Sequence, residues 1–399
     1  MLFHIYSTKK SGVIKMKQLL RKLVCLIIVC VVGISGTVTA SADEPVISAY
    51  AYSLYCVNTG EFLLTQNADE HLPMASTTKI MTAILGIEML QSDKEETIVT
   101  VTPDMYAEGS SMYLASGEQI LMSDLVSGML MVSGNDAANA ISLTVGGSTE
   151  NFAKLMNKKA AEIGLDDTNF VTPSGLDAQG HYTTACDLAK LMSYCMENSL
   201  FRQIDRAQSV TVNFITPQGK TQTYYNANRL LREYEYCIAG KTGYTDKAGR
   251  TLVSCAEKDG IRLIAVTLND GDDWNDHKKM FDYGFGMLSM EQLDMDFTDL
   301  KIPVVGGTKN NIEVAVGAQP SVCADSNGLD DVEAVYCIPK FVYAPIAKGN
   351  SVGTIKYYKN GVYAGQSEVT ADETAAYMEQ PTKFTENVVS FFKRMFRRK

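Results

Sequence analysis

The sequence of 399 residues predicts a mixed α/β domain, followed by a small all-β domain and a C-terminal amphipathic helix. Three observations support this prediction. Within residues 43–295, β-rich runs lie at both ends and segments with apolar residues at helical spacing lie between them. Over residues 296–380, short β runs are broken by Gly, Asn, Asp and Pro. Residues 381–399 place apolar side chains at helical spacing among basic ones.

Residues 1–42 read as a secretory signal peptide. They contain six Lys or Arg and no acidic residue, an apolar run at 23–34, and Ala40-Ser41-Ala42 as a small-residue cleavage site. The apolar run is too short for a membrane-spanning helix, although an uncleaved anchor remains an alternative. Because the basic segment is removed, the mature chain is more acidic than the net charge of −10. An acidic exported protein argues against nucleic acid as a partner.

The region 43–295 begins with a predicted β-hairpin over 46–64, which turns at Asn58-Thr59-Gly60. A helix starting near Ser76 follows, and a short strand is expected at 97–102. Apolar residues at helical spacing predict further helices at 123–131, 137–145, 151–163 and 183–196. Strands are predicted at 236–242, 250–256 and 261–269, before an amphipathic helix at 274–288. Strands at both ends indicate one domain that is closed by its terminal segments.

The last two segments differ from the first domain. The small β domain, residues 296–380, has expected strands at 312–316, 334–338, 351–359 and 362–369, and we interpret it as a β-sandwich. Residues 381–399 carry six Lys or Arg and one Glu, together with Phe384, Val388, Phe391, Phe392 and Met395. This helix is too charged to span a bilayer but fits the membrane surface. Packing of the helix against a domain is the alternative.

The stretch around Ser76 and Lys79 carries the first chemical signal. A helix that begins near Ser76 places Lys79 one turn on, on the same face. The following residues are apolar nearly all round, as in a helix buried at a domain centre. Burial lowers the pKa of a lysine, so that it can take a proton from a neighbouring hydroxyl. An isolated Ser-x-x-Lys is a weak motif, and Ser7 to Lys10 matches it as well.

Two further patches make the signal specific. Ser133-Gly-Asn135 and Lys241-Thr242-Gly243 follow Ser76-Thr-Thr-Lys79 in order. This set resembles the penicilloyl serine transferases, the penicillin-binding proteins and serine β-lactamases. Longer stretches, such as Lys241-Thr-Gly-Tyr-Thr-Asp-Lys-Ala-Gly, look like the low-molecular-weight D-alanyl-D-alanine carboxypeptidases. The resemblance covers about residues 46–399, and it implies an antiparallel sheet with helices on both faces.

The resemblance implies a role for each residue. Ser76 is the expected nucleophile, Lys79 its base, Ser133 a proton relay to the leaving amine, and Asn135 a hydrogen-bond partner of Lys79 and the substrate amide. The strand at 241–243 is expected to dock substrate by edge pairing, with Lys241 adding positive charge, Thr242 binding the terminal carboxylate and Gly243 allowing close approach. The backbone N–H groups of Ser76 and Tyr244 would form an oxyanion hole.

One family position departs from the pattern. Some relatives carry an Arg for the substrate carboxylate within Asn-Arg-Asn-x-Leu-Leu, whereas Ala227 stands there in Asn226-Ala-Asn-Arg229-Leu-Leu. Arg229, two positions along, is a candidate for this role, and a solvated surface arginine is the alternative. His181 is interpreted as structural, because it precedes a helix cap.

The predicted function is a serine-type D-Ala-D-Ala carboxypeptidase that acts on peptidoglycan pentapeptide stems through a Ser76 acyl-enzyme. β-Lactam antibiotics are expected to acylate the same serine. By this resemblance no metal or cofactor is needed, and a structural zinc site is not expected, since the chain has no Cys-x-x-Cys pair and no close His cluster. The expected location is the outer face of the bacterial cytoplasmic membrane or the cell wall. The alternatives are a β-lactam sensor or peptidoglycan scaffold with little turnover, and a secreted β-lactamase.

Overall fold

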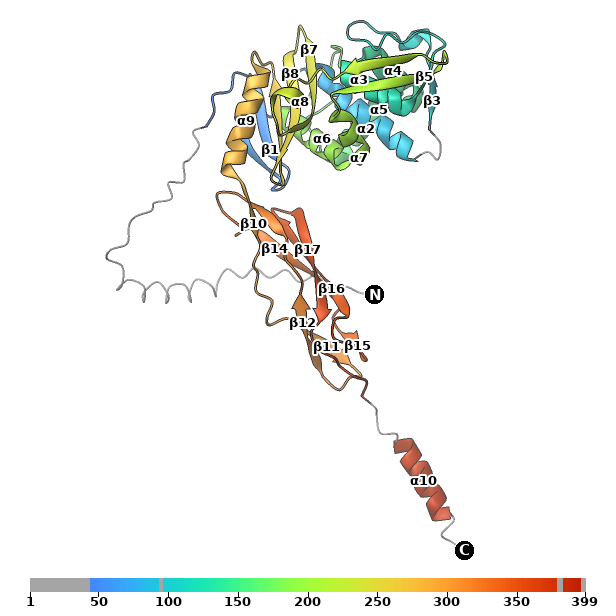
Figure 1. Ribbon diagram of the computed structural model, residues 1–399, viewed down its shortest axis with the longest axis vertical. Coiled ribbons are helices and arrows are strands. Elements are labelled where there is room, and N and C mark those ends of the chain that lie inside the picture. The colour runs from blue at the N-terminus through green and yellow to red at the C-terminus, as the bar shows by residue number, and fades with distance from the viewer. Residues whose placement is uncertain (1–43, 93–95, 379–382, 396–399) are drawn as a thin grey trace, which may run out of the picture. The chain divides into compact units, whose positions relative to one another are not determined.

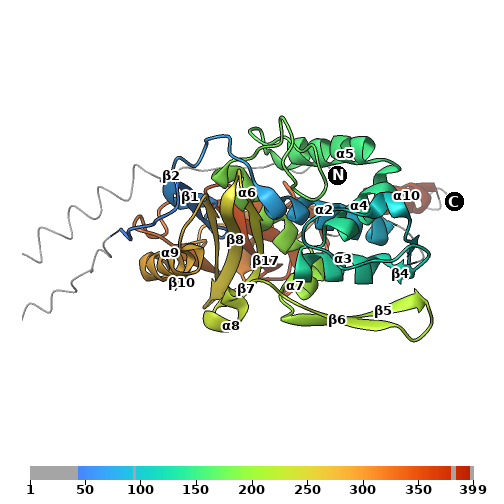
Figure 2. The ribbon, with the colours of Figure 1, turned by 90° about the horizontal axis from the view of Figure 1, so that it is seen from above.

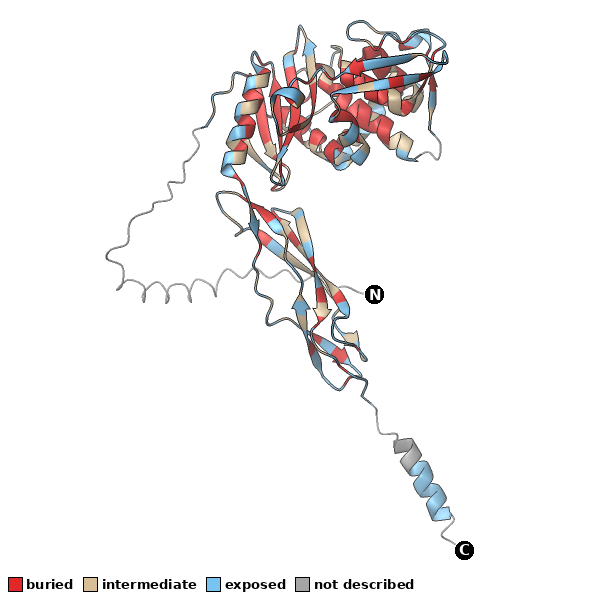
Figure 3. Cartoon of the chain, in the orientation of Figure 1, coloured by how far each residue is buried: buried red, intermediate tan, exposed pale blue. Residues whose placement is uncertain are grey.

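The computed structural model describes residues 44–92, 96–378 and 383–395, so the predicted signal peptide lies outside the described residues. The described chain forms two compact units. The larger holds the described residues up to Met290 together with Cys323–Gly328, and the smaller holds Glu291–Val322 and the described residues from Leu329 onward. Buried residues concentrate in the sheet and helices of the larger unit (Figure 3).

A five-stranded antiparallel sheet forms one half of the larger unit, in the order β2-β1-β9-β8-β7. Its strands are β1 (Ala51–Cys56), β2 (Glu61–Gln66), β7 (Cys237–Thr245), β8 (Gly249–Lys258) and β9 (Ile261–Leu268). The N-terminal hairpin joins the C-terminal strands directly, because β1 pairs with β9 from Ala51 opposite Leu268 to Cys56 opposite Leu263. The prediction of one domain closed by its terminal segments is therefore confirmed.

Helices cover both faces of this sheet (Figures 1 and 2). α9 (Asp273–Met287) lies on one face, and α6 (Ala185–Glu197) and the helices around it lie on the other. The remaining helices of the larger unit are α2 (Lys79–Ser92), α3 (Met122–Val132), α4 (Asn135–Gly146), α5 (Thr149–Ile163), α7 (Ser199–Asp205) and α8 (Leu230–Glu233), with a short 3₁₀ turn at Pro103–Met105. The mixed α/β fold with helices on both faces of an antiparallel sheet is confirmed.

A second sheet lies beside α3. It has four antiparallel strands in the order β3 (Ile98–Thr100), β4 (Gln119–Leu121), β5 (Ser209–Thr216) and β6 (Thr221–Tyr225). The sequence indicates strands from Ser209 onward, but β4 is only three residues long and was not predicted. Short strands lack the alternation of several residues that identifies longer ones.

The chain enters a helix near Ser76, as predicted, but the first turn is a 3₁₀ turn and not an α-helical one. Ala75–Thr78 form a 3₁₀ turn, and α2 begins at Lys79. The hydroxyls of Thr77 and Thr78 donate to the carbonyl oxygens of Met74 and Ala75, three residues back. Such local side-chain bonds compete with the α-helical pattern and favour the tighter turn.

The smaller unit is all-β apart from its last helix. Its strands β14 (Val332–Cys337), β16 (Ser351–Lys359), β17 (Val362–Ala371), β12 (Asn311–Val316), β11 (Lys301–Val305) and β15 (Val342–Tyr343) form one sheet in this order. The four predicted strands are β12, β14, β16 and β17, and the shorter β11 and β15 were not predicted. β10 (Ser289–Gln292) and β13 (Ser321–Ala324) make a separate pair.

The C-terminal helix α10 spans Lys383–Met395. Its apolar residues Val388, Phe391, Phe392 and Met395 are exposed. Across the described chain, no helix is both long enough and apolar enough to cross a membrane.

Candidate active site

Ser76 and Lys79 meet where the 3₁₀ turn passes into α2. The Nζ of Lys79 lies 2.9 Å from the Oγ of Ser76. The same amine donates to the Oδ1 of Asn135 (2.7 Å) and to the carbonyl oxygen of Ser174 (2.6 Å). The Lys79 side chain is fully buried, whereas Ser76 is half-buried. The partly exposed hydroxyl of Ser76 is therefore hydrogen-bonded to the fully buried amine of Lys79.

Burial also decides which amine of the site is neutral. It lowers the pKa of Lys79 well below the usual value, and the charge of Lys241 lowers it further. Burial lowers the pKa of Lys241 to about 8, but the carboxylate of Asp205 opposes this shift. Since neighbouring like charges disfavour each other, Lys79 is the amine that gives up its proton first. This order leaves a neutral amine at Lys79 while Lys241 is still an ammonium.

Ser133 and Asn135 connect these two amines. Ser133 ends α3 with a left-handed backbone (φ +60°), and its Oγ accepts a hydrogen bond of 2.9 Å from the Nζ of Lys241. Asn135 opens α4, and its Nδ2 donates to the carbonyl oxygen of Glu108 while its Oδ1 faces Lys79. The three sequence patches are thus brought into one hydrogen-bonded group.

β7 is an edge strand of the central sheet and runs beside the turn of Ser76. A Cβ at Gly243 would lie 2.8 Å from the backbone nitrogen of Ser76 and 2.4 Å from the Oγ1 of Thr251. Only glycine allows so close an approach of strand and turn.

The amides of β7 alternate between the two edges of the strand. The N–H of Gly240 donates out of the sheet to the Oδ2 of Asp205 (2.8 Å). Residues two and four places along a strand point their amides the same way, so the N–H groups of Thr242 and Tyr244 also face outward. A substrate laid along this edge would meet these two groups.

Asp136 was not identified from the sequence, although it directly follows Asn135. Its carboxylate accepts hydrogen bonds from the backbone nitrogens of Met112 (2.9 Å) and Leu114 (3.1 Å) and from the Oγ of Ser111 (2.7 Å). A carboxylate with several backbone donors fixes a loop firmly. Asp136 therefore holds the 108–117 loop, which also supplies the carbonyl oxygen that binds Asn135.

Residues 171–181 pack against the turn that carries Ser76. A Cβ at Gly175, where φ is +87°, would lie 1.9 Å from the carbonyl oxygen of Ala75. The backbone N–H of Val171 donates to the Nδ1 of His181, so the Nε2–H of His181 donates to the Oγ1 of Thr78. Burial lowers the pKa of His181 to about 4, which keeps the ring neutral. His181 thus supports the turn without contacting Ser76 in the described structure.

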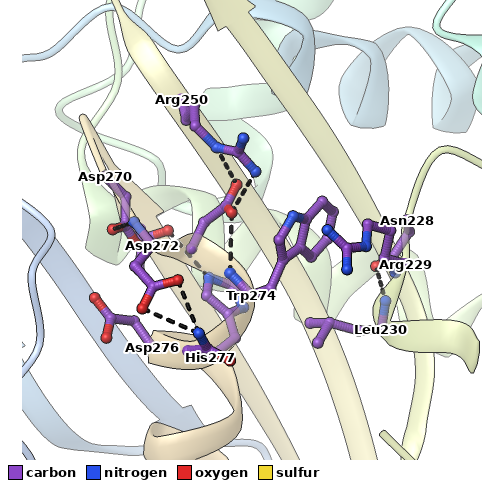
Figure 4. Close-up of polar contacts among 12 residues, drawn as sticks. Asn228, Arg229, Leu230, Arg250, Asp270, Asp272, Trp274, Asp276 and His277 are labelled. Carbon is purple, nitrogen blue, oxygen red and sulfur yellow. Dashed lines mark hydrogen bonds and ion pairs between the residues drawn. The ribbon is translucent and has the colours of Figure 1, made fainter. Parts of the chain in front are cut away.

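Arg229 belongs to a separate cluster of side chains around Trp274 (Figure 4). Its Nε donates to the Oε1 of Glu233 (2.8 Å), and its guanidinium stands 5.7 Å from the ring of Trp274. The guanidinium of Arg250 is also 5.7 Å from this ring, and it binds Asp273 through two nitrogens. Among the described residues, no hydrogen bond, ion pair or ring contact links Arg229 to the group around Ser76.

The other substrate-binding candidates lie at the β7 edge. The backbone oxygen of Thr242 accepts a hydrogen bond of 2.6 Å from the Nζ of Lys241. Tyr244 is exposed, and its hydroxyl donates to Asp246. Ser174 was missed by sequence reasoning because it contributes only a carbonyl oxygen, for which no side chain gives a signal.

A half-buried serine, a fully buried lysine within hydrogen-bond distance, and an open strand edge beside them define a serine hydrolase of the acyl-transferring kind. Residues 38–272 match the family model described as D-alanyl-D-alanine carboxypeptidase, and residues 295–377 match the C-terminal domain of penicillin-binding protein 5. The chain therefore belongs to the D-alanyl-D-alanine carboxypeptidase family and is a serine-type peptidase.

Named relatives and solved structures agree. The chain is 31% identical over 325 residues to D-alanyl-D-alanine carboxypeptidase DacF of Bacillus subtilis, covering 79% of this chain and 83% of that protein. It is 34% identical over 338 residues to D-alanyl-D-alanine carboxypeptidase DacC of Escherichia coli, covering 80% of this chain and 82% of that protein. Penicillin-binding protein 5 from Haemophilus influenzae matches with a TM-score of 0.60 and 27% identity, over 84% of this chain and 99% of that one.

Proposed function

We propose that this protein removes the terminal D-Ala from peptidoglycan pentapeptide stems through an acyl-enzyme on Ser76. The observation that carries the proposal is the 2.9 Å distance between the Oγ of Ser76 and the Nζ of the fully buried Lys79. The neutral amine takes the hydroxyl proton as the Oγ attacks the carbonyl carbon of the penultimate D-Ala. The amide bond then breaks, and the terminal D-Ala leaves as the amine.

The leaving amine needs a proton, and we propose that Ser133 delivers it. Its Oγ accepts a hydrogen bond from the Lys241 ammonium, so its own proton is free to point toward the substrate. The backbone N–H groups of Ser76 and Tyr244 serve as the oxyanion hole, which contributes about 10²–10³-fold per donor. Ser133 regains its proton from the Lys79 ammonium, so that Lys79 is neutral again. Water then attacks the Ser76 ester with Lys79 as base, the Oγ of Ser76 leaves and takes up the proton, and the tetrapeptide stem is released.

The test is release of D-Ala from a peptide that ends in Lys-D-Ala-D-Ala, with the intact mass after addition of benzylpenicillin as a second readout. We expect steady D-Ala release and a long-lived penicilloyl adduct. A stable adduct without D-Ala release would favour a sensor or scaffold. Rapid destruction of the penicillin would favour a β-lactamase.

The substrate carboxylate is proposed to bind Thr242 and Arg229. We expect Arg229→Gln to lower kcat/KM about 10- to 100-fold for a peptide ending in free D-Ala-D-Ala, because a charged hydrogen bond contributes about 1.5–3 kcal/mol. For the same peptide ending in D-Ala-D-Ala amide, Arg229→Gln should change kcat/KM little, since this peptide lacks the carboxylate. Measuring kcat/KM for both peptides checks this.

Arg250→Gln is the matched control, because Arg250 stands at the same 5.7 Å distance from the ring of Trp274 (Figure 4). A selective loss with Arg250→Gln in place of Arg229→Gln would transfer the role to Arg250. Equal losses on the acid and the amide peptide would contradict carboxylate binding by either arginine.

We also propose that the protein is exported and that α10 attaches it to the membrane surface. The exposed apolar residues of this helix and the basic residues Lys393 and Arg394 in its last turn support the proposal. The full chain from residue 43 should co-sediment with anionic lipid vesicles, and added salt should weaken the binding. A chain ending at residue 380 is the control. Equal sedimentation of the two chains would contradict the proposal.

A further inference from the structure

Asp205 is a buried carboxylate that the reaction described above does not use. It is the last residue of α7 and is 1% exposed. Its Oδ2 accepts the N–H of Gly240, but its Oδ1 is buried and has no hydrogen-bond partner among the described residues. Burying a carboxylate with an unpaired oxygen is costly. An apolar residue could fill the same space without this cost, so the carboxylate charge itself needs an explanation.

The bond to Gly240 places Asp205 at the start of the substrate-binding edge. Gly240 directly precedes Lys241, and its outward amide is the first in the alternating series that continues at Thr242 and Tyr244. The hydrogen bond to Asp205 uses the amide of Gly240 and leaves the amides of Thr242 and Tyr244 for a substrate. The contact therefore fixes the strand that carries Lys241 and sets where a docked substrate chain can begin to pair.

Asp205 is also the carboxylate that acts on Lys241. The Nζ of Lys241 donates to two neutral oxygens, those of Ser133 and Thr242, and no ion pair to Lys241 occurs in the described part of the chain. Asp205 is the charged group that raises the pKa of Lys241 against the effect of burial. A buried ammonium without a nearby negative charge would lose its proton more easily.

The other ionisable groups near this pair do not replace Asp205. The charge of Asp205 acts on Cys195, Cys237 and Cys255, which lie on α6, β7 and β8. Burial raises the pKa of Cys237 to about 12 and the pKa values of the other two thiols well above their usual value, so these three thiols are neutral. Lys79 faces Lys241 from α2, and its charge would only disfavour the Lys241 ammonium.

We propose that Asp205 is a positioning residue that keeps Lys241 charged and in place on Ser133, and so sets the pH range in which the proton relay works. This inference rests on the proposed function of the Ser76 site. Burial raises the pKa of Asp205 to about 7, against the opposing effects of the Gly240 amide and Lys241. Activity should therefore fall as the pH rises through about 8 and Lys241 loses its proton. Protonation of Asp205 near pH 7 should not by itself stop the reaction, because Lys241 is still charged at that pH.

The test compares pH profiles of kcat/KM for D-Ala release and of the acylation rate with benzylpenicillin, using the full chain from residue 43. Asp205→Asn keeps the shape and can still accept the Gly240 amide, but it removes the charge. We expect its alkaline limb to move to lower pH by about one unit, as removal of a neighbouring opposite charge predicts. Asp104→Asn, at an exposed position, should leave the alkaline limb unchanged.

A second variant covers the case in which Asp205→Asn does not fold. Lys241→Arg keeps a cation that does not titrate in this range, so the alkaline limb should vanish. Identical profiles for Asp205→Asn and the unchanged protein would overturn the proposal. So would an alkaline limb near pH 8 that persists in Lys241→Arg. If the unchanged protein neither releases D-Ala nor is acylated, the proposed function fails and not this inference.

Discussion

Replacing Ser76 by Ala is expected to lower kcat/KM for D-Ala release by at least about 10⁴-fold and to abolish the penicilloyl adduct. Without the Oγ, no ester to the enzyme can form. The fold should persist, because Lys79 keeps its bonds to Asn135 and Ser174. Free D-Ala and the intact mass after incubation with benzylpenicillin measure the two effects.

The matched control for this variant is Ser92→Ala. Ser92 ends α2, which follows the turn of Ser76; it is exposed, and its Oγ donates to the carbonyl oxygen of Met89. This variant should retain full activity. Undiminished D-Ala release by Ser76→Ala, or a penicilloyl group mapped to a different serine, would rule out Ser76 as the nucleophile.

The fold was predictable because its signals are local. Long helices such as α5 and α6 keep apolar residues at helical spacing, and their caps, Ser148 and Thr184, accept hydrogen bonds from the third residue on. The hairpin of β1 and β2 has a turn signal between two β-rich runs. The short strands β4, β11 and β15 depend on their partners instead, and their two to five residues carry too little pattern to be recognised.

The site was predictable only in part, for a related reason. The sequence patches supplied the side chains that the structure gathers around Lys79. Two of the supporting groups have no local signal. Asp205 reads as an ordinary helix end until α7 is packed on β7, and Ser174 contributes a backbone oxygen that depends on the path of its loop. Arg229 shows the converse, since its proximity to the motif in sequence does not by itself place it beside Ser76.

Lys79→Met is expected to lower kcat/KM by about 10³- to 10⁴-fold, because it removes the base and keeps an apolar side chain of similar length in a fully buried position. D-Ala release and the rate of penicilloyl adduct formation should fall together, since both begin with deprotonation of Ser76. Lys154→Met, at an exposed position of α5, is the control and should change neither rate. Normal acylation of Lys79→Met would exclude Lys79 as the base.

Lys79→Arg separates proton transfer from simple positive charge. Arginine can still donate hydrogen bonds toward Asn135 and Ser174, but it stays protonated and cannot accept a proton from Ser76. If Lys79 is the base, Lys79→Arg should be as slow as Lys79→Met at every pH. If Lys79 acts only through its charge, Lys79→Arg should keep most of the activity. The pKa of Lys79, lowered by burial and by Lys241, favours the first outcome, because it makes a neutral amine available beside the hydroxyl.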